Sequence, residues 1–215
     1  MKKAIIFGTG VFPETLFYYL KQEHICGFTV ESKYRNGEIY CDLPLVDFES
    51  VEKTFPPDEY GIYICLGYKN MNSERERIFK LAKEKGYEIL SYIHPSAVVN
   101  AKSMGIGNII LANAIVEPFC EIGDGNILKS GAHIAHHTKV GNYNFFAVSC
   151  VVAGSVNIGC NCFFGANCTV KNRINIKPYT LVGAGCYVSK DTEPFGVYVP
   201  ARSVLLPDKK STDML

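Results

Sequence analysis

The chain has 215 residues, of which 47% are hydrophobic and 20% charged, and its formal net charge at pH 7 is +1. These values are typical of a globular protein with one large domain or two small ones. The small net charge gives no support for a nucleic-acid or membrane-surface partner. No apolar run reaches the length of a membrane span or of a signal-peptide core, so we expect a cytoplasmic protein.

The N-terminal segment has the pattern of a strand, a glycine turn and a helix. The apolar run Ala4–Phe7 predicts a buried strand, and Gly8-Thr9-Gly10 precedes a helix with Pro13 in its first turn. A second strand, Ile25–Val30, ends at Glu31, where a dinucleotide site keeps its ribose-binding acid. However, Pro13 stands at the position of the third glycine in the Gly-x-Gly-x-x-Gly fingerprint, so the fingerprint is incomplete. A tight turn without a ligand therefore remains an alternative.

Further strands and a helix follow, after a stretch over residues 33–58 that we expect to be irregular. Ile62–Leu66 predicts a third strand, Ser73–Glu76 has the pattern of a capping box that starts a helix ended by Gly86, and Ile89–Ile93 predicts a fourth strand. This alternation predicts a small Rossmann-like parallel sheet that binds ligands at the carboxyl ends of its strands. The candidate binding residues at that edge are Gly8, Thr9, Gly10, Val11, Glu31, Gly67 and Tyr68.

A six-residue apolar repeat dominates the chain from Val98 to Val188. Neither the helical nor the strand period gives such a repeat, but short strands wound into triangular coils do, because each side uses about six residues. Four positions after most apolar residues stands a small or β-branched residue, which suits the corner of a narrow prism. The repeat comprises Val98, Met104, Ile110, Val116, Ile122, Leu128, Ile134, Val140, Phe146, Val152, Ile158, Phe164, Val170, Ile176, Val182 and Val188.

Glycine and cysteine occupy fixed phases of this repeat. Glycine follows the apolar residue at several positions, where we expect turns that need a permissive backbone. Four cysteines lie on the small-residue phase, so we expect them to be buried small hydrophobes, and we expect no disulfide framework. The glycines are Gly123, Gly141, Gly159, Gly165 and Gly183, and the cysteines are Cys150, Cys162, Cys168 and Cys186.

Three histidines, His133, His136 and His137, lie close together on the repeat. Histidine in its neutral form is a suitable general base near pH 7. Because one full coil takes about 18 residues, Gly154 stacks on His136, and its backbone N–H could donate to a developing oxyanion. Polar wall histidines without a chemical role are the alternative.

The chain resembles the hexapeptide-repeat sugar acetyltransferases, which include sialic-acid O-acetyltransferases and nucleotide-4-amino-sugar N-acetyltransferases. Four motifs carry the resemblance: Ile6-Phe7-Gly8-Thr9-Gly10, Leu66-Gly67-Tyr68-Lys69-Asn70, Tyr92-Ile93-His94-Pro95-Ser96-Ala97 and the segment from Gly131 to Gly141. It implies a Rossmann-like nucleotide-sugar domain over residues 1–93 and a left-handed parallel β-helix that binds acetyl-CoA over 94–190. An extension follows over 191–215, and we expect its polar tail, with Lys209, Lys210, Ser211 and Asp213, to be mobile. It also implies a homotrimer with active sites between subunits.

The resemblance assigns His136 as the catalytic base, with Gly154 at the oxyanion. His137 stands where the family usually has Glu or Asp, so the carboxylate that orients the base is missing from that position. Coenzyme A is expected along Gly154, Ala166, Gly183 and Ala184. Hexapeptide carbonic anhydrases bind zinc through histidines with a wider spacing. Here the histidines crowd one side of the coil, and we predict no metal.

The predicted function is therefore acetyl-CoA-dependent N-acetylation of a nucleotide-linked amino sugar, in lipopolysaccharide or capsule biosynthesis. O-acetylation of sialic acid or a related sugar is a second hypothesis. A non-catalytic nucleotide-sugar-binding trimer is a third, motivated by His137 in place of the acid.

Overall fold

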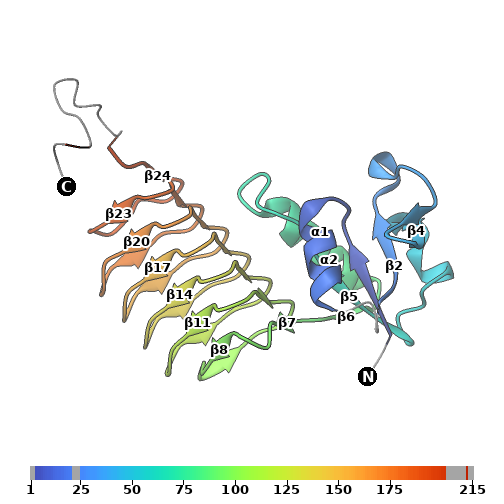
Figure 1. The fold of residues 1–215 in the computed structure, drawn as a ribbon, viewed down its shortest axis with the longest axis horizontal. Helices are drawn as coiled ribbons and strands as arrows, with labels where there is room; N and C mark the ends of the chain where they lie inside the picture. Colours follow the sequence, from blue (N-terminus) through green and yellow to red (C-terminus); the bar gives the residue numbers. More distant parts are fainter. Residues whose placement is uncertain (1–2, 21–24, 202–211, 213–215) are drawn as a thin grey trace.

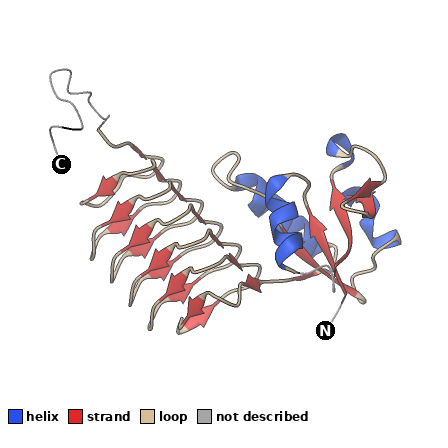
Figure 2. Ribbon diagram, viewed as in Figure 1, coloured by secondary structure: helices blue, strands red, loops and turns tan. Residues whose placement is uncertain are grey.

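A computed structural model describes residues 3–20, 25–201 and 212, and Figures 1 and 2 show its two units, an N-terminal α/β unit beside a long coil of short strands. The polar tail residues Lys209, Lys210, Ser211 and Asp213, expected to be mobile, lie outside the described residues. Among the described residues, no helix is long and apolar enough to cross a membrane.

The N-terminal unit is one sheet in the strand order β3-β4-β2-β1-β5-β6. All neighbouring strands are parallel except β3 and β4, which form an antiparallel edge. The strands are β1 (Lys3–Phe7), β2 (Ile25–Val30), β3 (Ile39–Tyr40), β4 (Leu43–Asp47), β5 (Tyr60–Ile64) and β6 (Glu88–Ile89). The helices are α1 (Val11–Tyr19), α2 (Ser73–Glu84) and the short 3₁₀ helices η1 (Ser32–Tyr34) and η2 (Phe48–Lys53).

The expectation that residues 33–58 are irregular was wrong. This stretch supplies β3, β4 and both 3₁₀ helices, and β4 pairs with β2 through Phe28 and Leu45, which are both buried. Pro44 concealed the strand, but it lies at the second residue of β4, and a proline is tolerated at the start of a strand or at the edge of a sheet.

The second helix begins without the predicted capping box. Asn72 is its N-cap and makes no side-chain capping bond, because its Nδ2 donates instead to the carbonyl of Cys162 in the coil at 3.0 Å. Glu76, the other residue of the predicted box, accepts a hydrogen bond from Asn161 of the coil at 2.9 Å instead of reaching back to the start of the helix. The predicted stop at Gly86 is confirmed: Gly86 has φ +86°, and the next N–H bonds back to the carbonyl of Ala82, as in a Schellman motif.

The strand predicted over Ile89–Ile93 is divided between the two units. Ile89 ends β6 in the N-terminal sheet, whereas Tyr92–Ile93 forms β7, which pairs with Ile109–Ile110 in the coil. The coil therefore begins at Tyr92.

The coil is a parallel β-helix with three walls. Wall 1 contains β7 (Tyr92–Ile93), β10 (Ile109–Ile110), β13 (Ile127–Leu128), β16 (Phe145–Phe146), β19 (Phe163–Phe164), β22 (Leu181–Val182) and β24 (Val197–Tyr198). Wall 2 contains β8 (Val98–Val99), β11 (Ile115–Val116), β14 (His133–Ile134), β17 (Val151–Val152), β20 (Thr169–Val170) and β23 (Tyr187–Val188). Wall 3 contains β9 (Ser103–Met104), β12 (Glu121–Ile122), β15 (Lys139–Val140), β18 (Asn157–Ile158) and β21 (Asn175–Ile176).

The predicted apolar repeat fills the axis of the coil, with one exception at its start. The repeat residues from Ile110 to Val188 lie in one buried cluster, together with the predicted cysteines, which are all free thiols. Val98 is 51% exposed, and Val99 packs inward in its place. The first coil is one residue short: Val99 pairs with Val116, 17 positions on, whereas Val116 pairs with Ile134, 18 positions on.

We expected the glycines that follow the apolar residues to be needed for turns, and this expectation was wrong. None of the five has a positive φ. Instead they lie against the backbone of the next coil: a Cβ on Gly141 would come within 2.8 Å of the Gly159 carbonyl oxygen. Close coil-to-coil packing is therefore the physical reason for these glycines. Left-handed corner positions are taken mostly by other residues, among them Asn113, Ser155, Asn167 and His137.

Arg75 joins the two units. Its side chain lies on α2, is fully buried, and donates to carbonyls of both units at 2.7–3.4 Å. Burial lowers the pKa of Arg75 to about 9, which leaves the guanidinium charged at neutral pH. The acceptors are Leu66 and Gly67 from the segment after β5, and Gly125, Tyr143 and Asn144 from the coil.

Arg75→Met should lower the free energy of unfolding by at least about 3 kcal/mol, because each buried carbonyl left without a donor costs about 1–3 kcal/mol. Urea denaturation at pH 7 measures this loss. Lys80→Met on the same helix is the matched control, because Lys80 is exposed and its ion pair with Glu76 is open to solvent and contributes little to stability. Equal losses for the two variants would contradict the role given to Arg75.

Candidate functional site

A pocket of about 360 Å³ lies at the carboxyl ends of β1, β2 and β5, at the predicted binding edge. Four of the predicted substrate-binding residues line it: Gly8, Thr9, Glu31 and Gly67. Gly8 has φ +125°, and a Cβ there would lie 2.7 Å from the Cys65 carbonyl oxygen, so only glycine fits this turn. The remaining lining residues are Phe7, Val30, Tyr34, Leu66, Lys69, Glu74, Arg77 and Ile78.

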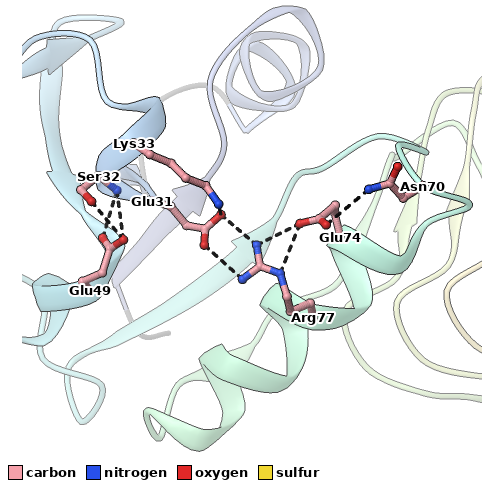
Figure 3. Close-up of polar contacts among 7 residues, drawn as sticks. All are labelled: Glu31, Ser32, Lys33, Glu49, Asn70, Glu74 and Arg77. Atoms are coloured by element: carbon pink, nitrogen blue, oxygen red, sulfur yellow. Dashed lines mark hydrogen bonds and ion pairs between the residues drawn. The ribbon is translucent and has the colours of Figure 1, made fainter.

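Three charged residues that line this pocket, Glu31, Glu74 and Arg77, form a network, whose contacts Figure 3 shows. Arg77 of α2 donates to both oxygens of Glu31, at 3.1 and 2.8 Å, and to Glu74 at 2.9 Å. The Arg77 hydrogen bonds hold the pKa of Glu31 below its usual value. The sequence did not reveal Arg77, because its partner Glu31 lies 46 positions away. The network gives the pocket both a fixed carboxylate and a fixed guanidinium.

The other predicted substrate-binding residues lie outside the lining of the pocket. The N–H of Gly10 donates to the hydroxyl of Tyr40 at 2.6 Å, and that hydroxyl donates to Glu14 at 2.9 Å. Val11 is 81% exposed. Tyr68 packs its ring against Phe145 and Phe163 of wall 1, with centroids 5.1 and 4.7 Å apart. The Gly10 N–H is thus bound by a protein hydroxyl and does not point into the pocket lining.

A second polar cluster lies on the corner between walls 2 and 3. We call this the histidine corner; it comprises Glu117, Phe119, His136, His137 and Gly154. His136 and His137 are both exposed, and their Nδ1 atoms lie 3.1 Å apart. His137 has φ +58°, the left-handed conformation that turns the chain at this corner.

The predicted stacking of Gly154 on His136 is confirmed. A Cβ on Gly154 would lie 2.5 Å from Cε1 and 2.7 Å from Nε2 of His136, so a side chain there would displace the ring. Among the described residues, no acceptor pairs with the Gly154 N–H. The arrangement therefore places a histidine nitrogen beside a backbone that carries no side chain.

Glu117 supplies a carboxylate that sequence reasoning missed. Its Oε2 accepts from the His136 backbone N–H at 2.8 Å, and its Oε1 lies 2.7 Å from Nε2 of His133. These two bonds, the His136 N–H first, hold the pKa of Glu117 below its usual value. The signal was present: Glu117 lies about one 18-residue coil before the His136 segment. The carboxylate fixes the backbone of His136, not its ring.

The predicted coenzyme residues lie on two different corners of one chain. Ala166, Gly183 and Ala184 are on the corner between walls 1 and 2, where the carbonyl of Ala166 accepts from the Gly185 N–H at 2.8 Å. Gly154 is on the histidine corner, across wall 2. Within the chain, these residues do not form one site.

The pocket and the histidine corner are also separated. The unit that carries the pocket packs on wall 1 and on the corner between walls 3 and 1, through Tyr68, Arg75 and Glu76, which accepts from Asn161 of the coil. The histidine corner is the edge of the prism opposite wall 1.

The described residues include no cluster of three or more His, Cys, Asp or Glu side chains placed to hold a metal ion.

Comparisons with known proteins give matches among solved structures only; no protein-family model and no curated protein matches the chain. Perosamine N-acetyltransferase from Caulobacter crescentus, solved as a histidine variant in complex with CoA and GDP-perosamine, superposes with a TM-score of 0.84 at 22% identity, over 93% of this chain and 94% of that one. The acetyltransferase domain of PglB from Neisseria gonorrhoeae gives 0.82 at 19% identity, over 93% and 97%.

WeeI from Acinetobacter baumannii superposes with a TM-score of 0.79 at 16% identity, over 93% of this chain and 97% of that one. These likenesses span both units. They confirm the predicted fold, a small α/β domain followed by a left-handed parallel β-helix.

Proposed function

We propose that the protein is an acetyl-CoA-dependent N-acetyltransferase that acts on the amino group of a nucleotide-linked sugar. The observation that carries the proposal is the ring of His136 held against Gly154 on an exposed corner of the coil. The solved structures with this fold include one in complex with CoA and GDP-perosamine and one in complex with acetyl coenzyme A.

The residues of the histidine corner can carry the acetyl group directly from acetyl-CoA to the amine, by addition and then breakdown of a tetrahedral oxyanion. The sugar amine attacks the thioester carbonyl, and His136 removes its proton as the C–N bond forms. The Gly154 N–H donates to the oxyanion. The C–S bond then breaks, and the proton passes from His136 to the coenzyme A thiolate. No acyl-enzyme is needed, so none of the buried cysteines has to act as a nucleophile.

The nucleotide belongs in the N-terminal pocket. Glu31 at the end of β2 is placed to accept from a ribose hydroxyl, as acids at this position of a doubly wound sheet do. Lys69 at the rim offers a charge to the phosphates. Coenzyme A would extend from Gly154 of one subunit towards Ala166, Gly183 and Ala184 of another.

We also propose a homotrimer, because a nucleotide sugar held in the pocket cannot reach His136 on the opposite edge of the same coil. A second copy that presents its histidine corner to the pocket completes the site. The same proposal places the enzyme in the cytoplasm, in the biosynthesis of a lipopolysaccharide or capsule sugar.

His136→Ala should lower kcat by about 10²–10⁴-fold, the usual contribution of a positioned general base. Coenzyme A affinity and Tm should change little, because the side chain is exposed. Initial rates with nucleotide-linked amino sugars, followed by release of free thiol, measure the effect. His133→Ala with the larger loss would assign the base to the His133–Glu117 pair instead.

Glu31→Gln should raise the KM for the nucleotide sugar by about 10–100-fold, since a hydrogen bond to a charged group contributes about 1.5–3 kcal/mol. The KM for acetyl-CoA should stay unchanged. Glu49→Gln is the matched control: Glu49 binds the nearby Ser32 N–H at 3.0 Å and does not line the pocket. If Glu31→Gln raised the KM for acetyl-CoA as much as the KM for the nucleotide sugar, the assignment of the nucleotide to this pocket would be wrong.

Two inactive variants should restore activity when they are co-expressed. Gly67→Trp blocks the pocket, where a Cβ meets nothing within 4 Å, and His136→Ala removes the base. If the site forms between subunits, mixed oligomers join an intact pocket to an intact histidine corner. Light scattering should give the mass of a trimer. A monomer, or mixed oligomers without activity, would contradict the shared site.

A further inference from the structure

The two imidazoles of the histidine corner form a directed hydrogen bond. Their Nδ1 atoms lie 3.1 Å apart, and the rings are nearly perpendicular, at 85°. Between two neutral histidines, one Nδ1 must carry the proton and the other must accept it. The direction of this bond decides which nitrogen of His136 is free.

Only one direction leaves His136 able to act as a base. If His137 donates, the proton of neutral His136 sits on Nε2, the nitrogen beside Gly154, and that nitrogen cannot take a proton from the substrate. If His136 donates from Nδ1, Nε2 keeps its lone pair. The second arrangement also survives catalysis, because the imidazolium of His136 still donates to neutral His137.

Three contacts hold this pair in place. Glu117 anchors the His136 backbone at 2.8 Å, and Gly154 leaves room for its ring. The ring of His137 lies against Phe119, with centroids 4.7 Å apart. The left-handed backbone at His137, with φ +58°, aims its side chain back at His136.

We propose that His137 is a positioning residue that accepts the hydrogen bond from Nδ1–H of His136 and thereby directs the Nε2 lone pair of His136 to the amine. A neutral imidazole thus replaces a carboxylate as the partner of the base. This inference rests on the proposed acetyl transfer.

Three substitutions of His137 separate the acceptor from the backbone. Asn and Asp tolerate the left-handed conformation, and their Oδ1 lies about where the imidazole Nδ1 lies, since both atoms are bonded to Cγ. Gly tolerates the backbone but has no acceptor. His137→Gly should lower kcat by about 10–100-fold, as the loss of an orienting partner typically does, while His137→Asn recovers most of the activity.

The pH profile distinguishes positioning from packing. A carboxylate beside an imidazole favours its protonated form, so the acid limb of the kcat/KM profile should lie at higher pH for His137→Asp than for His137→Asn. Asn113→Gly, at a left-handed exposed position on another corner, controls for the backbone change and should keep full activity. Superimposable Asn and Asp profiles, or an Asn variant as slow as Gly, would overturn the proposal.

Nitrogen-15 NMR of the imidazoles in substrate-free protein at pH 8 reads the bond without turnover. We expect His136 protonated at Nδ1 and His137 at Nε2. A His136 protonated at Nε2 overturns the positioning role. If NMR gives the expected tautomers but the protein turns over no nucleotide-linked amino sugar, the hydrogen bond is supported and the acetyl transfer is refuted. Failure of the positioning role and failure of the proposed function are therefore distinguishable.

Discussion

The two units depend on one buried guanidinium. Among the residues that the structure describes, no carboxylate pairs with Arg75. Five backbone carbonyls, from the segment after β5 and from two corner segments of the coil, compensate its charge. Removal of water from a charged group is costly unless every donor finds an acceptor, so this arrangement allows little variation in the angle between the units. Gly67 both accepts from Arg75 and lines the pocket. The contacts of Arg75 therefore also fix the Gly67 side of the candidate nucleotide pocket.

The coil imposes a second constraint, its 18-residue register. Each side chain has a neighbour one coil away, so chemistry on a corner is assembled from residues distant in sequence. His136 lies between Glu117 from the coil before and Gly154 from the coil after. The outward side chains of wall 3 are mostly polar or charged, whereas wall 2 presents Val98, Val151 and Tyr187 to solvent. Exposed apolar side chains on wall 2 are consistent with the proposed contact between copies.

The sequence predicted the coil well because a six-residue apolar period has few other physical explanations. It predicted Gly154 beside His136 for the same reason. It missed Glu117, although the same register places that residue next to the His136 segment. It could not reveal Arg77 with Glu31, because that contact depends on how α2 packs on the N-terminal sheet. It could not reveal Arg75 with the coil carbonyls, because those contacts depend on how the two units dock. The capping box at Ser73 failed similarly: Asn72 and Glu76 bind the coil, and a tertiary contact outweighed a local one.

In our proposal, the geometry of the histidine corner compensates for the absence of a carboxylate at position 137. A carboxylate next to the base would stabilise the imidazolium and so raise the basicity of His136. A neutral imidazole acceptor supplies orientation without that charge. Glu117 binds the His136 N–H and His133, so it holds the main chain, and in our proposal His137 holds the ring. A neutral amine is a stronger nucleophile than a neutral hydroxyl and depends less on proton removal before the new bond forms. For the proposed acetyl transfer, the imidazole pair therefore suits an amine acceptor better than a hydroxyl.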